Sequence, residues 1–274
     1  GPGSLIEFGE AVAAQLPRAQ AGEIAGLAVI GQPGVLAAGA DIVSARQLTD
    51  PDQGRGLADL GHEAYNLLAD FPVPTFAFIS GTALGGGLEI ALTAHYRTVS
   101  SDAKALGLPE IFLGLIPGWG GIYRVPRLIG PERAVEVIFK NPLNNNRSLK
   151  GPEAYEIGLA DALLDPDSFE QQSLDFAARI ISGDAELTQR VTTHREHDAG
   201  EAAWQRAIET ARSLVAAKTG DTAPGPLRAL EVFEQVRHRS RDEDRKAEVE
   251  ALGQLLVSDE FKNVEAIFKA DPAK

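Results

Sequence analysis

The chain has 274 residues and a formal net charge of −13, with a pI near 4.9, which argues against nucleic-acid or anionic-membrane binding, because both require a positive surface. It contains no cysteine, so disulfides, thiolate catalysis and cysteine-ligated metals are excluded. The longest apolar stretches, such as residues 71–80, are far shorter than the roughly 20 residues of a membrane-spanning helix, and we expect a soluble, cytoplasmic protein.

The first third of the chain alternates predicted helices and strands. Residues 1–4 (GPGS) are interpreted as an expression scar and are excluded from the fold prediction. Apolar residues at helical spacing predict helices over 5–20 and 54–70, and short apolar runs predict buried strands over 26–31 and 71–80.

The middle of the chain continues this pattern. The small-residue stretch 33–42 is predicted as a loop, and residues 89–100 as a helix that runs into a strand. Residues 130–139 and 150–164 are predicted helices with proline near the first turn, where its missing N–H costs little. Repeated strand-then-helix order predicts an α/β fold.

Beyond Asp165 the strand signals disappear. Residues 227–236 and 246–268 have the spacing of amphipathic helices, and the mixed-sign charged run 236–246 between them is predicted to be a solvated face. We expect this helical part to pack on the core or on a neighbouring subunit.

The glycine-rich stretch GTALGGGLEI, residues 81–90, follows a predicted strand. Consecutive glycines let the backbone approach a ligand and open a helix whose first N–H groups lack internal acceptors, which suits negative charge. Neither the P-loop nor the G-x-G-x-x-G spacing is present. Alternatively, the glycines serve only tight packing of a helix on a strand, and on this stretch alone the two interpretations carry equal weight.

Two isolated carboxylates lie in apolar surroundings. Glu89 follows the three glycines, and Glu110 follows proline in GLPEIFLGLIPGWGG, residues 107–121. Apolar walls raise carboxyl pKa values toward the range useful for acid–base catalysis. For each glutamate the alternative is a helix-terminus or salt-bridged residue.

Four stretches in this order resemble the enoyl-CoA hydratase/isomerase (crotonase) family: AAGADI (37–42), GTALGGGLEIAL (81–92), GLPEIFLGLIPGWGG (107–121) and AYEIGLADALL (154–164). The resemblance extends from about residue 5 to the C-terminus. It implies a crotonase-like spiral of ββα units and a C-terminal helical region that forms a homotrimer or a dimer of trimers. We therefore divide the chain into a crotonase core, 5–200, and a C-terminal helical region, 201–274.

The resemblance also implies a reaction and its residues. The backbone N–H groups of Ala40 and Gly86 would form an oxyanion hole for the thioester carbonyl. Glu89 would act as base toward water and Glu110 would deliver a proton to the α-carbon, giving hydration of trans-2-enoyl-CoA to 3-hydroxyacyl-CoA. Family members that only move a double bond typically lack the first acid, so the presence of Glu89 favours hydration.

Further substrate contacts are expected around these motifs. Lys262 and Phe268, with Lys269, are candidates for contacts to CoA from the C-terminal helix of an adjacent subunit. Trp119 either shapes the acyl pocket or anchors the core. The remaining predicted substrate-binding residues lie in the three motifs: Ala38, Asp41, Ile42, Gly85, Pro109, Pro117 and Gly118.

The sequence departs from the family pattern in three places. Val43 replaces a residue that is usually lysine, and Ile122 stands where threonine is frequent. The strand, hairpin and Asn-Pro-x-Asn-type segment that normally precede the opening helix have no counterpart before Leu5. We expect either a truncated record or a partly lost CoA site.

No metal or redox cofactor is implied, and CoA enters as part of the substrate. The stretches 26–42 and 258–270 resemble the hydratase part of multifunctional β-oxidation proteins, which suggests a 3-hydroxyacyl-CoA dehydrogenase as partner. Rival functions are enoyl-CoA isomerisation, acyl-CoA thioester hydrolysis, or non-catalytic acyl-CoA binding. His194, His197 and Asp198 are set aside as metal ligands because their stretch is strongly polar and lacks a clear fourth ligand.

Overall fold

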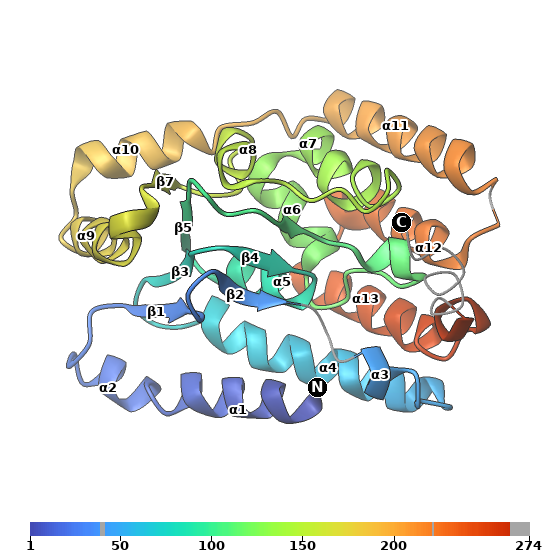
Figure 1. Cartoon of the computed structure of the whole chain (residues 1–274), viewed down its shortest axis with the longest axis horizontal. Helices are drawn as coiled ribbons and strands as arrows, with labels where there is room; N and C mark the ends of the chain where they lie inside the picture. The colour runs from blue at the N-terminus through green and yellow to red at the C-terminus, as the bar shows by residue number, and fades with distance from the viewer. Residues whose placement is uncertain (39–41, 221, 264–274) are drawn as a thin grey trace.

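Seven short strands form two parallel sheets in the described part of the chain (Figure 1). Successive strands along the chain belong alternately to the first and the second sheet. The computed structural model describes residues 1–38, 42–220 and 222–263. The first sheet has the order β1-β3-β5-β7, with β1 (Leu27–Ile30), β3 (Thr75–Ile79), β5 (Tyr96–Ser100) and β7 (Ala162–Leu164). The second has the order β2-β4-β6, with β2 (Val35–Ala38), β4 (Thr82–Leu84) and β6 (Leu106–Gly107).

Each repeat of the fold contributes one strand to each sheet and then a helix. The three helices that close these repeats are α4 (Pro51–Ala69), α5 (Gly86–Thr93) and α6 (Gly121–Ile129). The predicted spiral of ββα units is therefore confirmed. The loop predicted over 33–42 is wrong in part, because it contains β2, and the glycine-rich stretch begins with β4. Alanine and glycine are depleted in strands, which hid both elements.

Further helices cover the sheets and close the C-terminal part. The α-helices are α1 (Pro2–Ala13), α2 (Leu16–Gln20), α3 (Ile42–Ala45), α7 (Pro131–Val135), α8 (Gly151–Glu156), α9 (Phe169–Ile181), α10 (Ala185–His194), α11 (Glu201–Thr219), α12 (Pro224–Gln235) and α13 (Arg241–Leu255). Short 3₁₀ or π turns are η1 (Glu110–Leu113), η2 (Glu136–Lys140), η3 (Pro166–Ser168) and η4 (Val236–His238). Asp50 begins α4 by accepting the N–H of Asp52 at 2.9 Å, and Pro51 suits its first turn.

Two predicted helices end earlier than expected. The helix predicted over 150–164 stops at Glu156, because Gly158 takes a φ of +85° and the apolar residues that follow enter the sheet as β7 beside β5. The helix predicted over 246–268 instead spans Arg241–Leu255, and its predicted end lies outside the described residues. The α1 helix already includes residues 2–4, and the proposed domain boundaries remain predictions.

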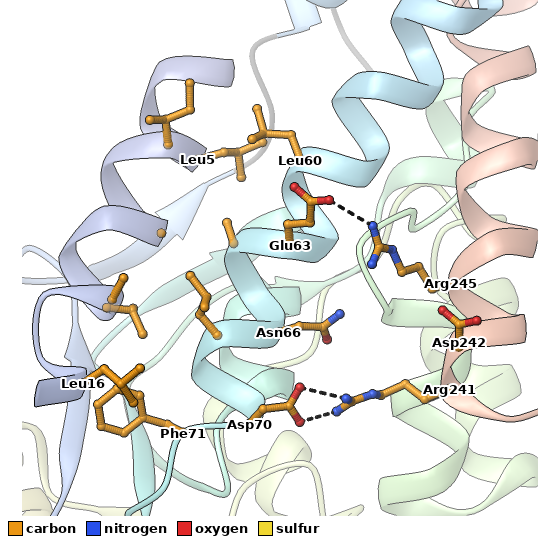
Figure 2. Close-up of a pocket in the computed structure, with 16 residues that line it drawn as sticks. Leu5, Leu16, Leu60, Glu63, Asn66, Asp70, Phe71, Arg241, Asp242 and Arg245 are labelled. Carbon is orange, nitrogen blue, oxygen red and sulfur yellow. Dashed lines mark hydrogen bonds and ion pairs between the residues drawn. The ribbon is translucent and has the colours of Figure 1, made fainter. Parts of the chain in front are cut away.

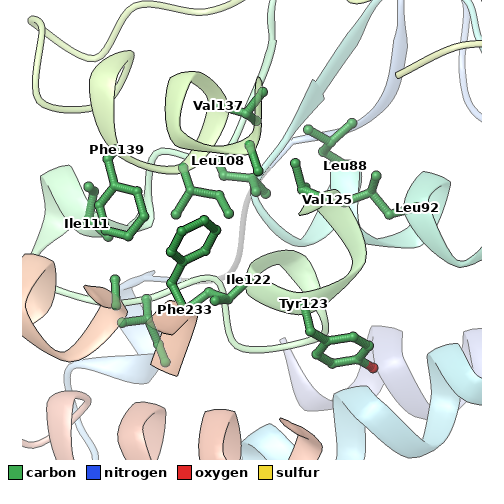
Figure 3. Close-up of a cluster of buried hydrophobic side chains, with 14 of the residues drawn as sticks. Leu88, Leu92, Leu108, Ile111, Ile122, Tyr123, Val125, Val137, Phe139 and Phe233 are labelled. Carbon is green, nitrogen blue, oxygen red and sulfur yellow. The ribbon is translucent and has the colours of Figure 1, made fainter. Parts of the chain in front are cut away.

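The main hydrophobic core lies between α5, α6 and α12 (Figure 3). Leu88 from α5 and Val125 from α6 are fully buried there. Phe139 meets Phe233 of α12 edge to face, with ring centroids 5.5 Å apart, a geometry that aromatic pairs favour. This packing holds the N-terminal ends of α5 and α6 in a fixed relation.

The C-terminal helices pack on the core of the same chain, α11 against α7, α12 against η1 and α13 along α4 (Figure 1). The expectation that they pack on the core is confirmed. The solvated face predicted for 236–246 is wrong in part, because Asp244 is fully buried and accepts a hydrogen bond from Arg127 of α6. Among the described residues no helix is long and apolar enough to cross a lipid bilayer.

Candidate active site

A cavity of about 320 Å³ lies at the N-terminal end of α5. Ile42, Gly86, Glu89 and Glu110 line it together with Gly118 and Trp119 of the turn before α6. Its remaining wall is mainly apolar, and includes Leu57 and Leu60 of α4, Leu252 of α13, and Phe261, with the polar residues Ser44 and Gln53. The two predicted catalytic glutamates thus share one largely apolar chamber.

The other predicted site residues are placed less directly. Three of them come directly before a residue that lines the cavity: Gly85, Pro109 and Pro117. Ala38 ends β2 and its side chain is exposed. Lys262 donates its backbone N–H to Ser258 O at 3.1 Å, and its neighbour Phe261 lines the cavity instead. Ala40, Asp41 and Phe268 lie outside the described residues.

The glycines of the α5 N-terminus pack too closely for side chains. Gly85 takes φ +54°, a conformation that favours glycine. A Cβ on Gly86 would lie 2.4 Å from Cζ3 of Trp119, and one on Gly87 would lie 2.2 Å from Ala37 O. Close packing is therefore required here, and the same two residues also present the first-turn N–H groups that lack intrahelical acceptors.

Glu89 is 1% exposed and is held by two backbone donors. The N–H groups of Trp119 and Gly121 both bind its Oε1 atom, each at 2.8 Å. Burial, followed by the nearby Glu248 carboxyl, raises the pKa of Glu89 to about 7, while the two N–H groups act in the opposite direction. Both protonation states are thus accessible near neutral pH.

Glu110 begins η1, and its Oε2 atom is buried without a hydrogen-bond partner in the described part of the chain. Burial, and then the charge of Glu89, raises the pKa of Glu110 well above its usual range. Two acids whose pKa values are separated by their surroundings are suited to distinct acid and base roles.

Sequence reasoning missed three buried residues beside this cavity. Tyr65 of α4 donates its hydroxyl to Gly86 O at 3.1 Å, and its ring meets that of Trp119 edge to face at 5.6 Å. Glu248 of α13 and His62 of α4 lie behind the turn, with Oε2 and Nε2 3.3 Å apart. The signal for Glu248 was its four-residue spacing to Leu252, which places both on one face of a helix.

Two other features were considered as sites. His194 Nε2 contacts Tyr155 O and His197 Nδ1 contacts Arg195 O, each at 2.7 Å, and within the described ranges no group of three or more His, Cys, Asp or Glu side chains could hold a metal ion. A larger cavity of about 650 Å³ lies between α1, α4 and α13 (Figure 2), and none of the predicted site residues lines it.

The model of the enoyl-CoA hydratase/isomerase family matches residues 12–224. This chain belongs to that family. The sequence prediction of a crotonase-family protein is thereby confirmed.

Named relatives place the chain more closely within the enoyl-CoA hydratase/isomerase family. It is 32% identical to the fatty acid oxidation complex subunit alpha of Idiomarina loihiensis over 98% of this chain and 37% of that protein. It is 36% identical to the subunit of that name from Pseudomonas aeruginosa over 84% of this chain and 32% of that protein. The chain therefore spans about a third of the length of these curated relatives.

A solved structure shows the same fold. The carnitinyl-CoA dehydratase of Mycobacterium thermoresistibile aligns over 100% of this chain and 85% of its own, with a TM-score of 0.69 and 18% identity. At that identity the likeness concerns the fold alone. Together with the family match, it identifies the architecture as crotonase-like.

Proposed function

We propose that this chain hydrates trans-2-enoyl-CoA to 3-hydroxyacyl-CoA. The observation that carries the proposal is the pair Glu89 and Glu110, which line one apolar cavity beside the first turn of α5. The pKa of Glu89 is raised to about 7 and that of Glu110 well above its usual range. An ionised base and a protonated acid can therefore coexist there.

In the proposed reaction, water adds across the α,β double bond. The Glu89 carboxylate takes a proton from water as the oxygen attacks the β-carbon, and Glu110 gives a proton to the α-carbon. Negative charge that develops on the thioester oxygen is bound by backbone N–H groups, with Gly86 and Ala40 as the proposed donors. Such preorganised donors are typically worth about 10²–10³ in rate each.

The wider role is part of the proposal. The names of the relatives support a place in fatty-acid β-oxidation, with a 3-hydroxyacyl-CoA dehydrogenase as partner that would oxidise the product. We propose a homotrimer or dimer of trimers on the strength of the family resemblance. The proposed reaction uses CoA as part of the substrate and needs no separate cofactor.

The test is turnover of crotonyl-CoA and of a longer enoyl-CoA, followed by loss of the conjugated enoyl absorbance. Both Glu89→Gln and Glu110→Gln are expected to lose roughly 10²-fold or more in kcat, since each removes an acid–base group. Glu170→Gln is the matched control, because Glu170 also lies in the first turn of a helix but is exposed.

The outcomes separate the rival functions. Absent turnover by the parent with CoA thioesters still bound would indicate a binding subunit. Conversion of a 3-enoyl-CoA that depends on Glu110 but not on Glu89 would indicate an isomerase, and release of free CoA would indicate a thioesterase.

A further inference from the structure

The turn at residues 119–122, which includes the first two residues of α6, lies between two buried carboxyl groups and binds them alternately. The N–H groups of Trp119 and Gly121 bind Glu89, while those of Gly120 and Ile122 bind Glu248 at 2.7 and 3.1 Å. Gly120 takes φ +112°, which a side chain would strain. The four consecutive N–H groups of residues 119–122 thus alternate between the two carboxyl groups.

Glu248 is fully buried. It is not one of the described residues that line the cavity holding Glu89 and Glu110. Burying a carboxyl group is costly unless hydrogen bonds satisfy it, and the two N–H groups do so. Its Oε2 atom also lies 3.3 Å from Nε2 of the fully buried His62. Because burial lowers the pKa of His62 to about 4, this ring is neutral at pH 7.

Ion pairs join α13, which carries Glu248, to α4 along its length. Arg241 binds Asp70 through two hydrogen bonds of 2.6 and 2.7 Å, and Arg245 binds Glu63 at 3.3 Å (Figure 2). Arg245 also binds Asp59 of α4, at 2.7 Å.

On the other side of Glu248 the two helices approach through glycines. A Cβ on Gly54 would lie 2.7 Å from Gly253 O, so the backbones touch at this point. Contacts between α13 and α4 thus lie both before and after Glu248 in the sequence, and together they place Glu248 beside the turn.

We propose that Glu248 is a positioning residue: by binding the N–H groups of Gly120 and Ile122, it orients the turn so that Trp119 and Gly121 hold the Glu89 carboxyl group in the cavity. The catalytic meaning of this role rests on the proposed function, whereas the structural role does not. Glu248 acts through Glu89 and has no contact with the cavity, so its removal is expected to change kcat far more than KM.

Hydrogen–deuterium exchange tests the structural role without requiring turnover. Glu248→Gln keeps one acceptor oxygen and Glu248→Met keeps none at similar volume. Exchange of the amides of residues 119–122 is expected to rise in Glu248→Met and to a smaller extent in Glu248→Gln. It should stay at the parent level in Glu250→Gln, a partly exposed residue on the same helix that does not contact the turn.

Kinetics test whether the effect passes through Glu89. At metal sites, loss of a residue that orients a ligand typically costs 10- to 100-fold, and for a residue that orients Glu89 we expect kcat to fall about 10-fold or more in Glu248→Met, with KM within about 2-fold of the parent. In a Glu89→Gln background the same change should cause no further loss, because residues that act as a unit are not additive.

Several results would overturn the proposal. These are unchanged exchange over residues 119–122, losses that multiply in the double variant, or a rise in KM equal to the fall in kcat. If Glu248→Met does not fold, Glu248→Gln carries both measurements. If the parent shows no turnover, the proposed function fails, and the exchange experiment still decides the role of Glu248 in holding the turn.

Discussion

Glu89 binds both of its backbone donors through a single oxygen. Since the N–H groups of Trp119 and Gly121 end on Oε1, neither amide uses the other carboxylate oxygen. A glutamine can therefore retain both hydrogen bonds while removing the charge. This makes Glu89→Gln a clean probe of what it costs to bury that charge.

We predict that Glu89→Gln becomes more stabilising, relative to the parent, as pH rises from about 4.5 to 8. The pKa of Glu89 is raised to about 7 in the folded protein, so the folded state binds the proton more tightly than the unfolded state. Below the unfolded pKa of about 4.3 both states are protonated and no penalty exists. Near pH 8 the penalty is almost complete, and it is worth about 3–4 kcal/mol.

Urea unfolding at pH 4.5 and pH 8 measures this difference, with Glu170→Gln as the exposed control. An identical difference between parent and Glu89→Gln at both pH values would mean that the folded pKa of Glu89 is not raised.

Sequence reasoning found the site where neighbouring residues were apolar. Glu89 and Glu110 were predicted because each is an isolated acid within an apolar stretch, and the structure places both on the cavity. Glu248 was not predicted because its own stretch is rich in charge, and His62 was interpreted as a packing or surface residue; their contact arises only when α13 packs on α4. A contact between residues 62 and 248 cannot be recognised from the sequence pattern around either one.

At the scale of elements, α13 is attached to the core by an ion pair whose carboxylate, Asp244, is fully buried, and by several more exposed ion pairs. Arg127 of α6 binds the fully buried Asp244, donates to Arg239 O at 3.0 Å, and lies over the Tyr123 ring at 5.2 Å. Exposed ion pairs contribute little, whereas removing one partner of a buried pair leaves an uncompensated charge.

We therefore predict that Arg127→Met lowers the free energy of unfolding by about 2–4 kcal/mol, since Asp244 would lose its cation. Arg206→Met, which breaks an exposed pair with Glu132, should change it by less than about 1 kcal/mol. Chemical denaturation of the two variants gives the comparison. Equal effects would contradict the assignment of Arg127 as the anchor of α13.

Strands were harder to predict than helices. β1 and β3 were predicted from apolar runs, while β2, β4 and β6 consist mainly of small residues and are two to four residues long. Their pairing is set by the sheet they join, which a local pattern cannot reveal.

At the scale of the whole molecule, the C-terminal helices and the core form one packed body. α11 contacts α7 and α13 contacts α4, and Glu248 reaches the turn beside the cavity that holds Glu89 and Glu110. We predict that the core and the C-terminal helices unfold in a single transition, although the sequence suggested a boundary near residue 200.

Two tryptophans report on the two parts, Trp119 beside the cavity and Trp204 on α11. Each variant, Trp204→Phe and Trp119→Phe, retains one tryptophan whose fluorescence follows denaturation. The two fluorescence curves should have the same slope, and in each variant the fluorescence midpoint should equal the midpoint measured by circular dichroism. A separate early transition of Trp204 would show that the helical region unfolds independently.

The alternating hydrogen bonds of the 119–122 turn also bear on protein synthesis. Both sheets are complete once β7 has been made, but Glu248 is translated more than 80 residues after β7. Until α13 has been made, the amides of Gly120 and Ile122 lack the Glu248 acceptor that they have in the folded chain. The Glu89 carboxyl group, the proposed base, gains this support only after α13 has been synthesised, so the sheets can form before the proposed active geometry is complete.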